Sequence, residues 1–249
     1  MTVALLSIRN LSKSFGGIKA VNDVSFDIAG GTVVGLIGPN GAGKTALINL
    51  ISGFYTDATG SIILDGEEIL NRSIHRIARR GISRTFQNIR LIPRLTVLEN
   101  VLLAFQEDTL RPLRSFFKLD HRVAAKRALD YLEFVGLRHR ADHLAGTLAY
   151  GEARRLEIVR GLARHPKLLV MDEPAAGMNE AETAELIELI RSCRSHVSSI
   201  LLIEHDITMV RTLSDGLIAM NDGAKIAEGP PEIVLNDPAV RAAYMGADN

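Results

Sequence analysis

The sequence predicts an α/β fold built on a mostly parallel sheet, with an antiparallel β-subdomain and a helical subdomain beside it. Apolar runs typical of buried strands alternate with helical patterns, and such alternation favours a parallel sheet with covered faces. The clearest runs are residues 32–37, 167–171 and 199–204. We expect one domain over residues 1–249, with its core and β-subdomain in 1–87 and 151–249 and the helical subdomain at about 88–150.

The first third of the chain is expected to be rich in strands. Residues 3–8 form a candidate strand, residues 24–28 alternate between apolar and polar types, and Asp65-Gly66 signals a tight hairpin. Phe15 lies in a Ser-Phe-Gly-Gly stretch between the first two strands. Its ring is suited to stacking on a base, although an aromatic residue at such a position is more often part of a core.

The rest of the chain alternates between helices and strands. Thr96 and Glu99 have capping-box spacing, and Gly81 and Gly136 stand where helices should end. Residues 106–119 show no clear periodicity. In order, we expect helices or strands at 73–80 (helix), 82–86 (strand), 96–105 and 120–135 (helices), 150–165 (helix), 167–171 (strand), 179–194 (helix), 199–204 (strand) and 216–227 (hairpin).

A glycine-rich stretch follows the first buried run and leads into a helical pattern over 46–51, which Gly53 ends. Glycines let backbone N–H groups crowd around phosphate oxygens, and the helix N-terminus adds partial positive charge. Strand, glycine-rich turn and helix in this order predict a phosphate-binding loop, and therefore a P-loop nucleotide hydrolase core. Lys44 would reach the β- and γ-phosphates, and the Thr45 hydroxyl would bind Mg²⁺. The loop residues are Gly38, Pro39, Asn40, Gly41, Ala42, Gly43, Lys44 and Thr45.

Polar side chains follow two of the predicted strands. Asp172 and Glu173 come after the run 167–171, and His205 follows 199–204. Ligands of parallel sheets bind at the carboxyl ends of the strands, so Asp172 would hold Mg²⁺, usually through water. Glu173 would orient or deprotonate the attacking water. His205 is placed to hydrogen-bond the γ-phosphate, and the alternative is a surface histidine.

Composition excludes several classes of protein. Lys plus Arg equals Asp plus Glu at 29 each, so no net charge draws the chain to nucleic acid or anionic lipid. The single cysteine, Cys193, excludes a disulfide framework or a thiolate cluster and suits a reducing compartment. No run is long and apolar enough for a membrane span, and no basic leader begins the chain. We expect any membrane role to depend on a partner.

These features together resemble the ATP-binding subunit of an ABC transporter over the whole chain. The motifs in family order are Phe15 at the adenine-stacking position, the phosphate loop, Gln87 in Thr85-Phe86-Gln87, the signature-like Leu148-Ala149-Tyr150-Gly151-Glu152, residues 168–173, residues 176–179 and His205. Within the family, the chain is most similar to the branch serving uptake of branched-chain and other hydrophobic amino acids. The marks of that branch are residues 154–158, 173–177, 203–206 and 243–246.

The resemblance implies two such subunits that enclose two ATP molecules head to tail. It assigns catalysis to Glu173, His205, Gln87 and Lys44. It adds Phe15 and Ala46 to the loop residues that contact nucleotide, and it places Thr45, Gln87 and Asp172 at Mg²⁺. The partner's nucleotide would be met in trans by Ala149, Tyr150, Gly151 and Glu152.

The resemblance also implies partners and a location. The partners are transmembrane permease subunits, a second and non-identical ABC ATPase subunit and, indirectly, a periplasmic or extracellular solute-binding protein, with no nucleic acid. The chain would be peripheral at the cytoplasmic face of the inner (plasma) membrane.

The chain departs from the family pattern at four positions. Ala149 and Tyr150 stand where the wider family has Ser and Gly, and Glu152 replaces the commoner Gln. Ala46 replaces a Thr or Ser whose hydroxyl reaches the α-phosphate, which removes one hydrogen bond worth about 0.5–1.5 kcal/mol.

Three alternatives to an amino-acid importer stay open at this point. The first is an importer ATPase for urea or short amides. The second is a soluble ABC ATPase that acts in iron–sulfur assembly or on nucleic acid. The third is a non-hydrolysing binding module, which Glu173 and His205 argue against.

Overall fold

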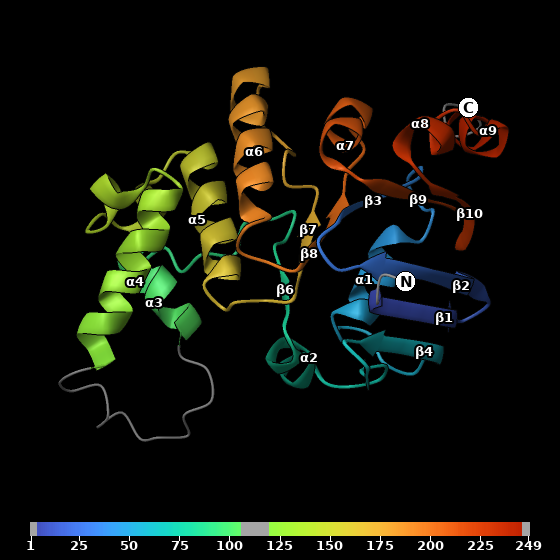
Figure 1. The fold of residues 1–249 in the computed structure, drawn as a ribbon, viewed down its shortest axis with the longest axis horizontal. Helices are drawn as coiled ribbons and strands as arrows, with labels where there is room; N and C mark the ends of the chain where they lie inside the picture. Colours follow the sequence, from blue (N-terminus) through green and yellow to red (C-terminus); the bar gives the residue numbers. More distant parts are fainter. Residues whose placement is uncertain (1–3, 106–119, 246–249) are drawn as a thin grey trace.

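Two sheets and a group of helices make up the fold in the computed structural model, which describes residues 4–105 and 120–245 (Figure 1). The expectations for Val3, for residues 106–119 and for Gly246 lie outside the described residues. An antiparallel sheet has the order β2-β1-β4-β5. Its strands are β1 (Ala4–Phe15), β2 (Ile18–Ala29), β4 (Thr59–Leu64) and β5 (Glu67–Glu68). The β-rich first third is thus confirmed, although β1 and β2 are much longer than expected because they pair along their whole length.

A second sheet of six strands has the order β10-β9-β3-β8-β7-β6. Five of its strands are parallel, and β10 pairs antiparallel with β9 at one edge. The strands are β3 (Val33–Ile37), β6 (Ile82–Arg84), β7 (Leu168–Asp172), β8 (Ser199–Ile203), β9 (Gly216–Asn221) and β10 (Ala224–Gly229). Every residue of β3, β7 and β8 is buried, as expected for strands covered on both faces.

The helices that the sequence indicated begin and end near the expected residues, whereas the helices Ile207–Leu213, Pro231–Val234 and Pro238–Met245 were not expected. Thr96 Oγ1 accepts from the Glu99 N–H at 3.1 Å, and Glu99 Oε2 accepts from the Thr96 N–H at 2.7 Å, so the capping box is confirmed. Gly81 ends its helix with a φ of 106°. The helices are α1 (Lys44–Ile51), α2 (Ile74–Arg80), α3 (Val97–Leu102), α4 (Asp120–Phe134), α5 (Tyr150–Leu162), α6 (Glu180–Cys193), α7 (Ile207–Leu213), α8 (Pro231–Val234) and α9 (Pro238–Met245), with 3₁₀ turns Leu103–Phe105, Arg138–Arg140 and Ala145–Thr147.

Apolar side chains cover the parallel sheet on both faces. On one face, residues such as Leu36, Val170 and Leu201 pack in a core with β1, β2, β4 and α1. On the other, residues such as Leu169 and Leu202 pack with α3, α4, α5 and α6. Figure 1 shows α4, α5 and α6 on one side of the parallel strands and β1, β2 and α1 on the other. The boundary of a helical subdomain at about residues 88–150 stays a prediction.

Across the described parts of the chain, no helix combines the length and the apolarity needed to cross a lipid bilayer.

Candidate functional site

The phosphate loop joins the end of β3 to the start of α1, as predicted. Its glycines adopt φ values of 150° at Gly38, 82° at Gly41 and 96° at Gly43, which side chains disfavour. A Cβ on Gly38 would lie 2.3 Å from the Met220 carbonyl oxygen, and one on Gly43 would lie 2.3 Å from that of Ala20. Only glycine fits at these two positions, so the loop conformation depends on the residues that the motif requires.

Lys44 is the first residue of α1, and its buried side chain extends back toward the phosphate loop. Its Nζ donates to the carbonyl oxygens of Gly38 at 2.6 Å and Pro39 at 3.0 Å. Burial lowers the pKa of Lys44, whereas the carboxylates of Glu173 and Asp172 raise it. The ammonium group therefore lies in the field of both predicted strand-end acids, and Thr45 follows it with an exposed side chain.

Asp172 is the last residue of β7, and Arg84 at the end of β6 neutralises it. Arg84 Nη2 lies 2.7 Å from Asp172 Oδ2, and the side chains are only 8% and 13% exposed. The other terminal nitrogen of Arg84 donates to Asn49 Oδ1 at 2.6 Å. This network, which the sequence pattern did not indicate, holds the carboxylate in one place next to the phosphate loop.

Glu173 has a strained backbone and a direct link to Gln87. Its φ is 46°, in the left-handed region, and its N–H donates to the Ile203 carbonyl at 2.9 Å. Gln87 Nε2 donates to Glu173 Oε2 at 2.8 Å. Two residues that the sequence placed in one site, 86 positions apart, therefore lie in hydrogen-bond contact.

His205 follows β8 with a side chain that is 66% exposed. Its neighbour Glu204 is 1% exposed and accepts from the backbone N–H groups of Ala175 at 2.9 Å and His205 at 3.2 Å. Burial raises the pKa of Glu204, and those two N–H donors oppose the shift. Glu204 therefore joins the loop after Glu173 to the start of the His205 loop, a role that the sequence analysis missed.

Phe15 is not a core residue, because 43% of it is exposed. Its ring centroid lies 4.9 Å from that of Tyr55, with the two rings edge to face, and Lys13 Nζ lies 5.3 Å from the Phe15 centroid. The core alternative is therefore wrong, and the adenine-stacking role stays a prediction.

The signature segment lies apart from the phosphate loop of its own chain. Figure 1 shows α5, which begins at Tyr150, separated from α1 by α6 and the parallel strands. Ala149 has no side-chain oxygen with which to cap the helix, and Glu152 Oε2 accepts from the Ala149 N–H at 3.1 Å. Burial opposes ionisation of Glu152, but that bond and Arg140 at 3.1 Å lower its pKa. The charge of Glu152 is thus partly compensated within the chain.

A bond from α9 to the phosphate loop was not predicted. The Gly38 N–H donates to the Tyr244 hydroxyl at 2.9 Å, across 206 positions of sequence. Burial raises the pKa of Tyr244, which keeps the hydroxyl neutral. The only signal in the sequence was the branch-like tail that contains Tyr244.

The described residues contain no cluster of three or more His, Cys, Asp or Glu side chains that would hold a metal by itself. The donors that the sequence predicted, the Thr45 hydroxyl, the fixed Asp172 carboxylate and the amide oxygen of Gln87, are hard oxygen ligands. They fit Mg²⁺, which takes few protein ligands and completes its shell with phosphates and water.

Known proteins with a similar sequence or fold indicate the family of this chain. A profile of the ABC transporter family matches residues 21–176, and a profile of the branched-chain amino acid ATP-binding cassette transporter matches residues 224–248. The chain is 44% identical to the high-affinity branched-chain amino acid transport ATP-binding protein BraF of Pseudomonas aeruginosa, and 43% identical to LivG of Escherichia coli K12. Each alignment covers 99% of both chains. The solved ATP-binding cassette MJ1267, in its ADP conformation, matches with a TM-score of 0.87 and 34% identity over 98% of this chain and 100% of that chain.

Proposed function

This chain belongs to the ABC transporter family and is an ATP hydrolase, and we propose that it powers an importer of branched-chain or other hydrophobic amino acids. The observation that carries the substrate class is the similarity to BraF and LivG over 99% of the chain. The match of residues 224–248 to the branched-chain profile agrees with it. This similarity favours transport over iron–sulfur assembly or nucleic-acid work, and nothing in the structure favours urea or short amides.

The proposed chemistry uses the groups that the fold brings together. Lys44 and the loop N–H groups bind the β- and γ-phosphates. Thr45, Asp172 and Gln87 would hold Mg²⁺, which neutralises charge on the phosphates when bound. Glu173 orients and deprotonates the attacking water, Gln87 positions Glu173 through their 2.8 Å hydrogen bond, and His205 binds the γ-phosphate from the adjacent strand end.

The position of the signature segment supports the proposed assembly. Since α5 lies away from α1, Ala149 to Glu152 are available to a nucleotide on a second subunit (Figure 1). We place the chain in a head-to-tail pair with a second, non-identical ATPase. Permease subunits would hold that pair at the cytoplasmic face of the inner membrane, with a solute-binding protein on the far side.

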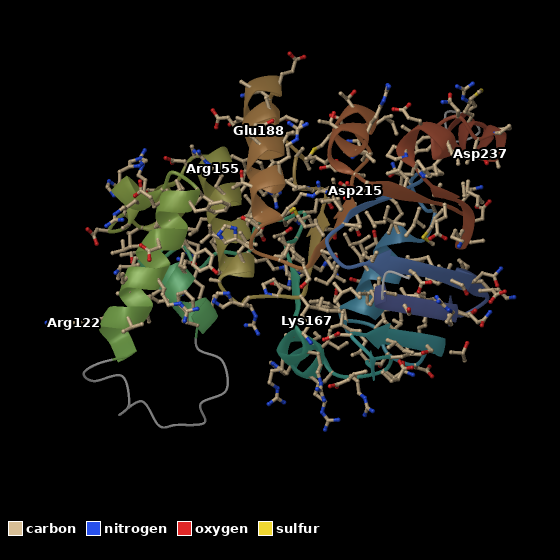
Figure 2. The ribbon with its side chains drawn as sticks, in the orientation of Figure 1. Arg122, Arg155, Lys167, Glu188, Asp215 and Asp237 are labelled. Carbon is tan, nitrogen blue, oxygen red and sulfur yellow. The ribbon has the colours of Figure 1, made fainter. Side chains whose placement is uncertain are left out.

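Replacing Glu173 with Gln tests the hydrolytic assignment. The amide keeps the size of the side chain but cannot take a proton, so kcat should fall by about 10²–10⁴-fold while the Kd for Mg-ATP changes little. Steady-state turnover and equilibrium nucleotide binding measure the two quantities. The matched control is Glu188→Gln on α6, whose side chain is 69% exposed and lies far from the loop (Figure 2). Near-normal turnover of Glu173→Gln would rule out the assigned base.

The substrate class is tested in proteoliposomes that contain the chain with its cognate ATPase, permease and solute-binding subunits. ATP-dependent accumulation of labelled leucine and isoleucine, but not of urea, supports the proposal. Accumulation of urea without leucine would move the chain to the urea and amide branch.

A further inference from the structure

A charged side chain with no exposed surface lies beneath the Gln87 segment. Arg154 on α5 is 0% exposed, and its terminal nitrogens make four contacts. Nη1 donates to the Phe86 carbonyl at 2.6 Å and to Glu157 Oε2 at 2.7 Å. Nη2 donates to the Gln87 carbonyl at 2.8 Å and to the Tyr150 hydroxyl at 3.1 Å. Burying a guanidinium costs free energy, which its hydrogen bonds and its ion pair must offset. An apolar side chain would fill the same space without that cost, so packing alone does not explain an arginine here.

The two carbonyls flank the backbone of Gln87, whose side chain reaches Glu173. Arg154 therefore holds the backbone on both sides of the Gln87 Cα. The Gln87 side chain, which donates the 2.8 Å hydrogen bond to Glu173, extends from that fixed backbone. The ion-pair partner of Arg154, Glu157, which is 3% exposed, binds the same segment. Glu157 Oε1 accepts from the Phe86 N–H at 3.4 Å and from the Arg90 N–H at 3.2 Å. Acceptors and donors of the segment 86–90 are thus both bound by one pair on α5.

The same guanidinium is joined to the signature segment. The Tyr150 hydroxyl, which accepts from Arg154, donates to the Ala176 carbonyl at 2.7 Å, in the loop after Glu173. Tyr150 stands where the family resemblance led us to expect glycine. The first turn of α5 is therefore connected by direct hydrogen bonds to the segments that carry Gln87 and Glu173.

We propose that Arg154 is a positioning residue for ATP hydrolysis, which sets the Gln87–Glu173 contact and couples it to the signature segment of the same chain. This rests on the proposed roles of Gln87 and Glu173. A guanidinium suits the role because its planar fork binds several acceptors in a fixed geometry, which an ammonium cannot do. If the α5 N-terminus moves when it contacts the partner's nucleotide, the hydrogen bonds of Arg154 and Tyr150 would transmit that movement to Gln87 and Glu173 of this chain.

The test removes the ion pair as a unit, because deleting one partner leaves a buried charge unpaired. In Arg154→Met combined with Glu157→Leu, we expect a cooperative melt and nearly unchanged Mg-ATP affinity. We expect kcat to fall by about 10²-fold, the scale of a small misplacement in an active site. Arg154→Lys keeps the charge opposite Glu157 but loses the fork, so its kcat should be intermediate. The matched control is Arg155→Gln, on the same helix, whose ion pair is instead with Glu185 at 3.8 Å.

A mutant cycle separates positioning from general stability. In a Gln87→Ala background, the Arg154 changes should cost little further kcat, because the residue through which they act is gone. Equal losses with and without Gln87, or full kcat in the folded apolar pair, would overturn the proposal. If the apolar pair does not fold, Arg154→Lys carries the same cycle. Failure of the proposed roles is distinguished by the Glu173→Gln and Gln87→Ala variants alone, because near-normal kcat in either would remove the premise whatever the Arg154 variants do.

Discussion

At the scale of single residues, the site holds a carboxylate with two prospective partners. Asp172 is paired with Arg84 in the structure and is the residue proposed to hold Mg²⁺. Arg84 also lies over the Phe86 ring at 4.9 Å and is bound to Asn49, so it is fixed from several sides. A fixed cation beside the acid lowers the cost of burying its charge before any metal arrives.

Replacing Arg84 with Gln should destabilise the protein. It should also allow Mg²⁺ to stabilise the variant in the absence of nucleotide. Breaking a largely buried pair costs about 3–5 kcal/mol, and a divalent cation at Asp172 should recover part of this. The free energy of unfolding in urea, with and without Mg²⁺ and in the absence of nucleotide, measures both effects. Arg191→Gln is the control, because its pair with Glu188 is exposed and worth about 0–1 kcal/mol. Equal stabilisation of both variants by Mg²⁺ would contradict the assignment of Asp172.

At the scale of elements, α6 shows how local signals and burial combine. Asn179 Oδ1 accepts from the Glu182 N–H at 3.0 Å, and Glu182 Oε2 accepts from the Asn179 N–H at 3.0 Å. This capping box begins the helix. At the other end, Cys193 is 0% exposed and packs with Leu189 and Ile190 in the core over the parallel sheet. The helix is therefore held at both ends, by hydrogen bonds at the first and apolar contact at the last.

Cys193 should be inert toward thiol reagents in the folded protein. Burial raises its pKa from 9.0 to about 12, which lowers the thiolate fraction about 1,000-fold, and the reagent has no access. Reaction with a chromogenic disulfide at mildly alkaline pH should be slow in buffer and rapid in urea, and its rate should report the opening of α6. Ser192→Cys, one residue earlier and exposed, should label at once. Rapid labelling of native Cys193 would show that this end of α6 is open.

Elements with strong end signals were predictable, and contacts between distant residues were not. Gly81 and Asn179 marked helix ends correctly, whereas α7 was missed although Asp206 caps it, because no glycine ends it as Gly81 ends α2. The phosphate loop and the strand-end acids were found because each adjoins a buried apolar run. The partners of Arg84, Arg154 and Tyr244 lie 88, 68 and 206 positions away, and only the tertiary fold brings them together.

At the scale of the whole molecule, the phosphate loop and the signature segment lie on separate parts of the fold (Figure 1). Under the proposed function, a nucleotide at Lys44 would not contact the α5 N-terminus of its own chain, and a second chain would supply that segment. Hydrolysis should then depend on association, which a single folded chain cannot replace.

Turnover of the isolated chain should rise with the square of its concentration while pairs are scarce, because two chains form each complete site. Mixing provides the decisive control. Glu173→Gln and Gly151→Asp should each be inactive alone. Their mixture should regain activity, since one of its two sites combines an intact base with an intact signature. A rate linear in concentration, with no recovery on mixing, would contradict the head-to-tail pair.

The pairing of β3 also has a consequence during synthesis on the ribosome. β3, which ends at the phosphate loop, lies between β8 and β9 and so has neither strand partner until residues 199–221 are made. The bond from Gly38 to Tyr244 waits for 206 further residues, roughly 10–40 s at about 5–20 residues per second. The nascent chain thus carries its phosphate loop without these sheet partners and without the Tyr244 bond through most of translation. ATP should protect it from proteases only after Tyr244 has emerged.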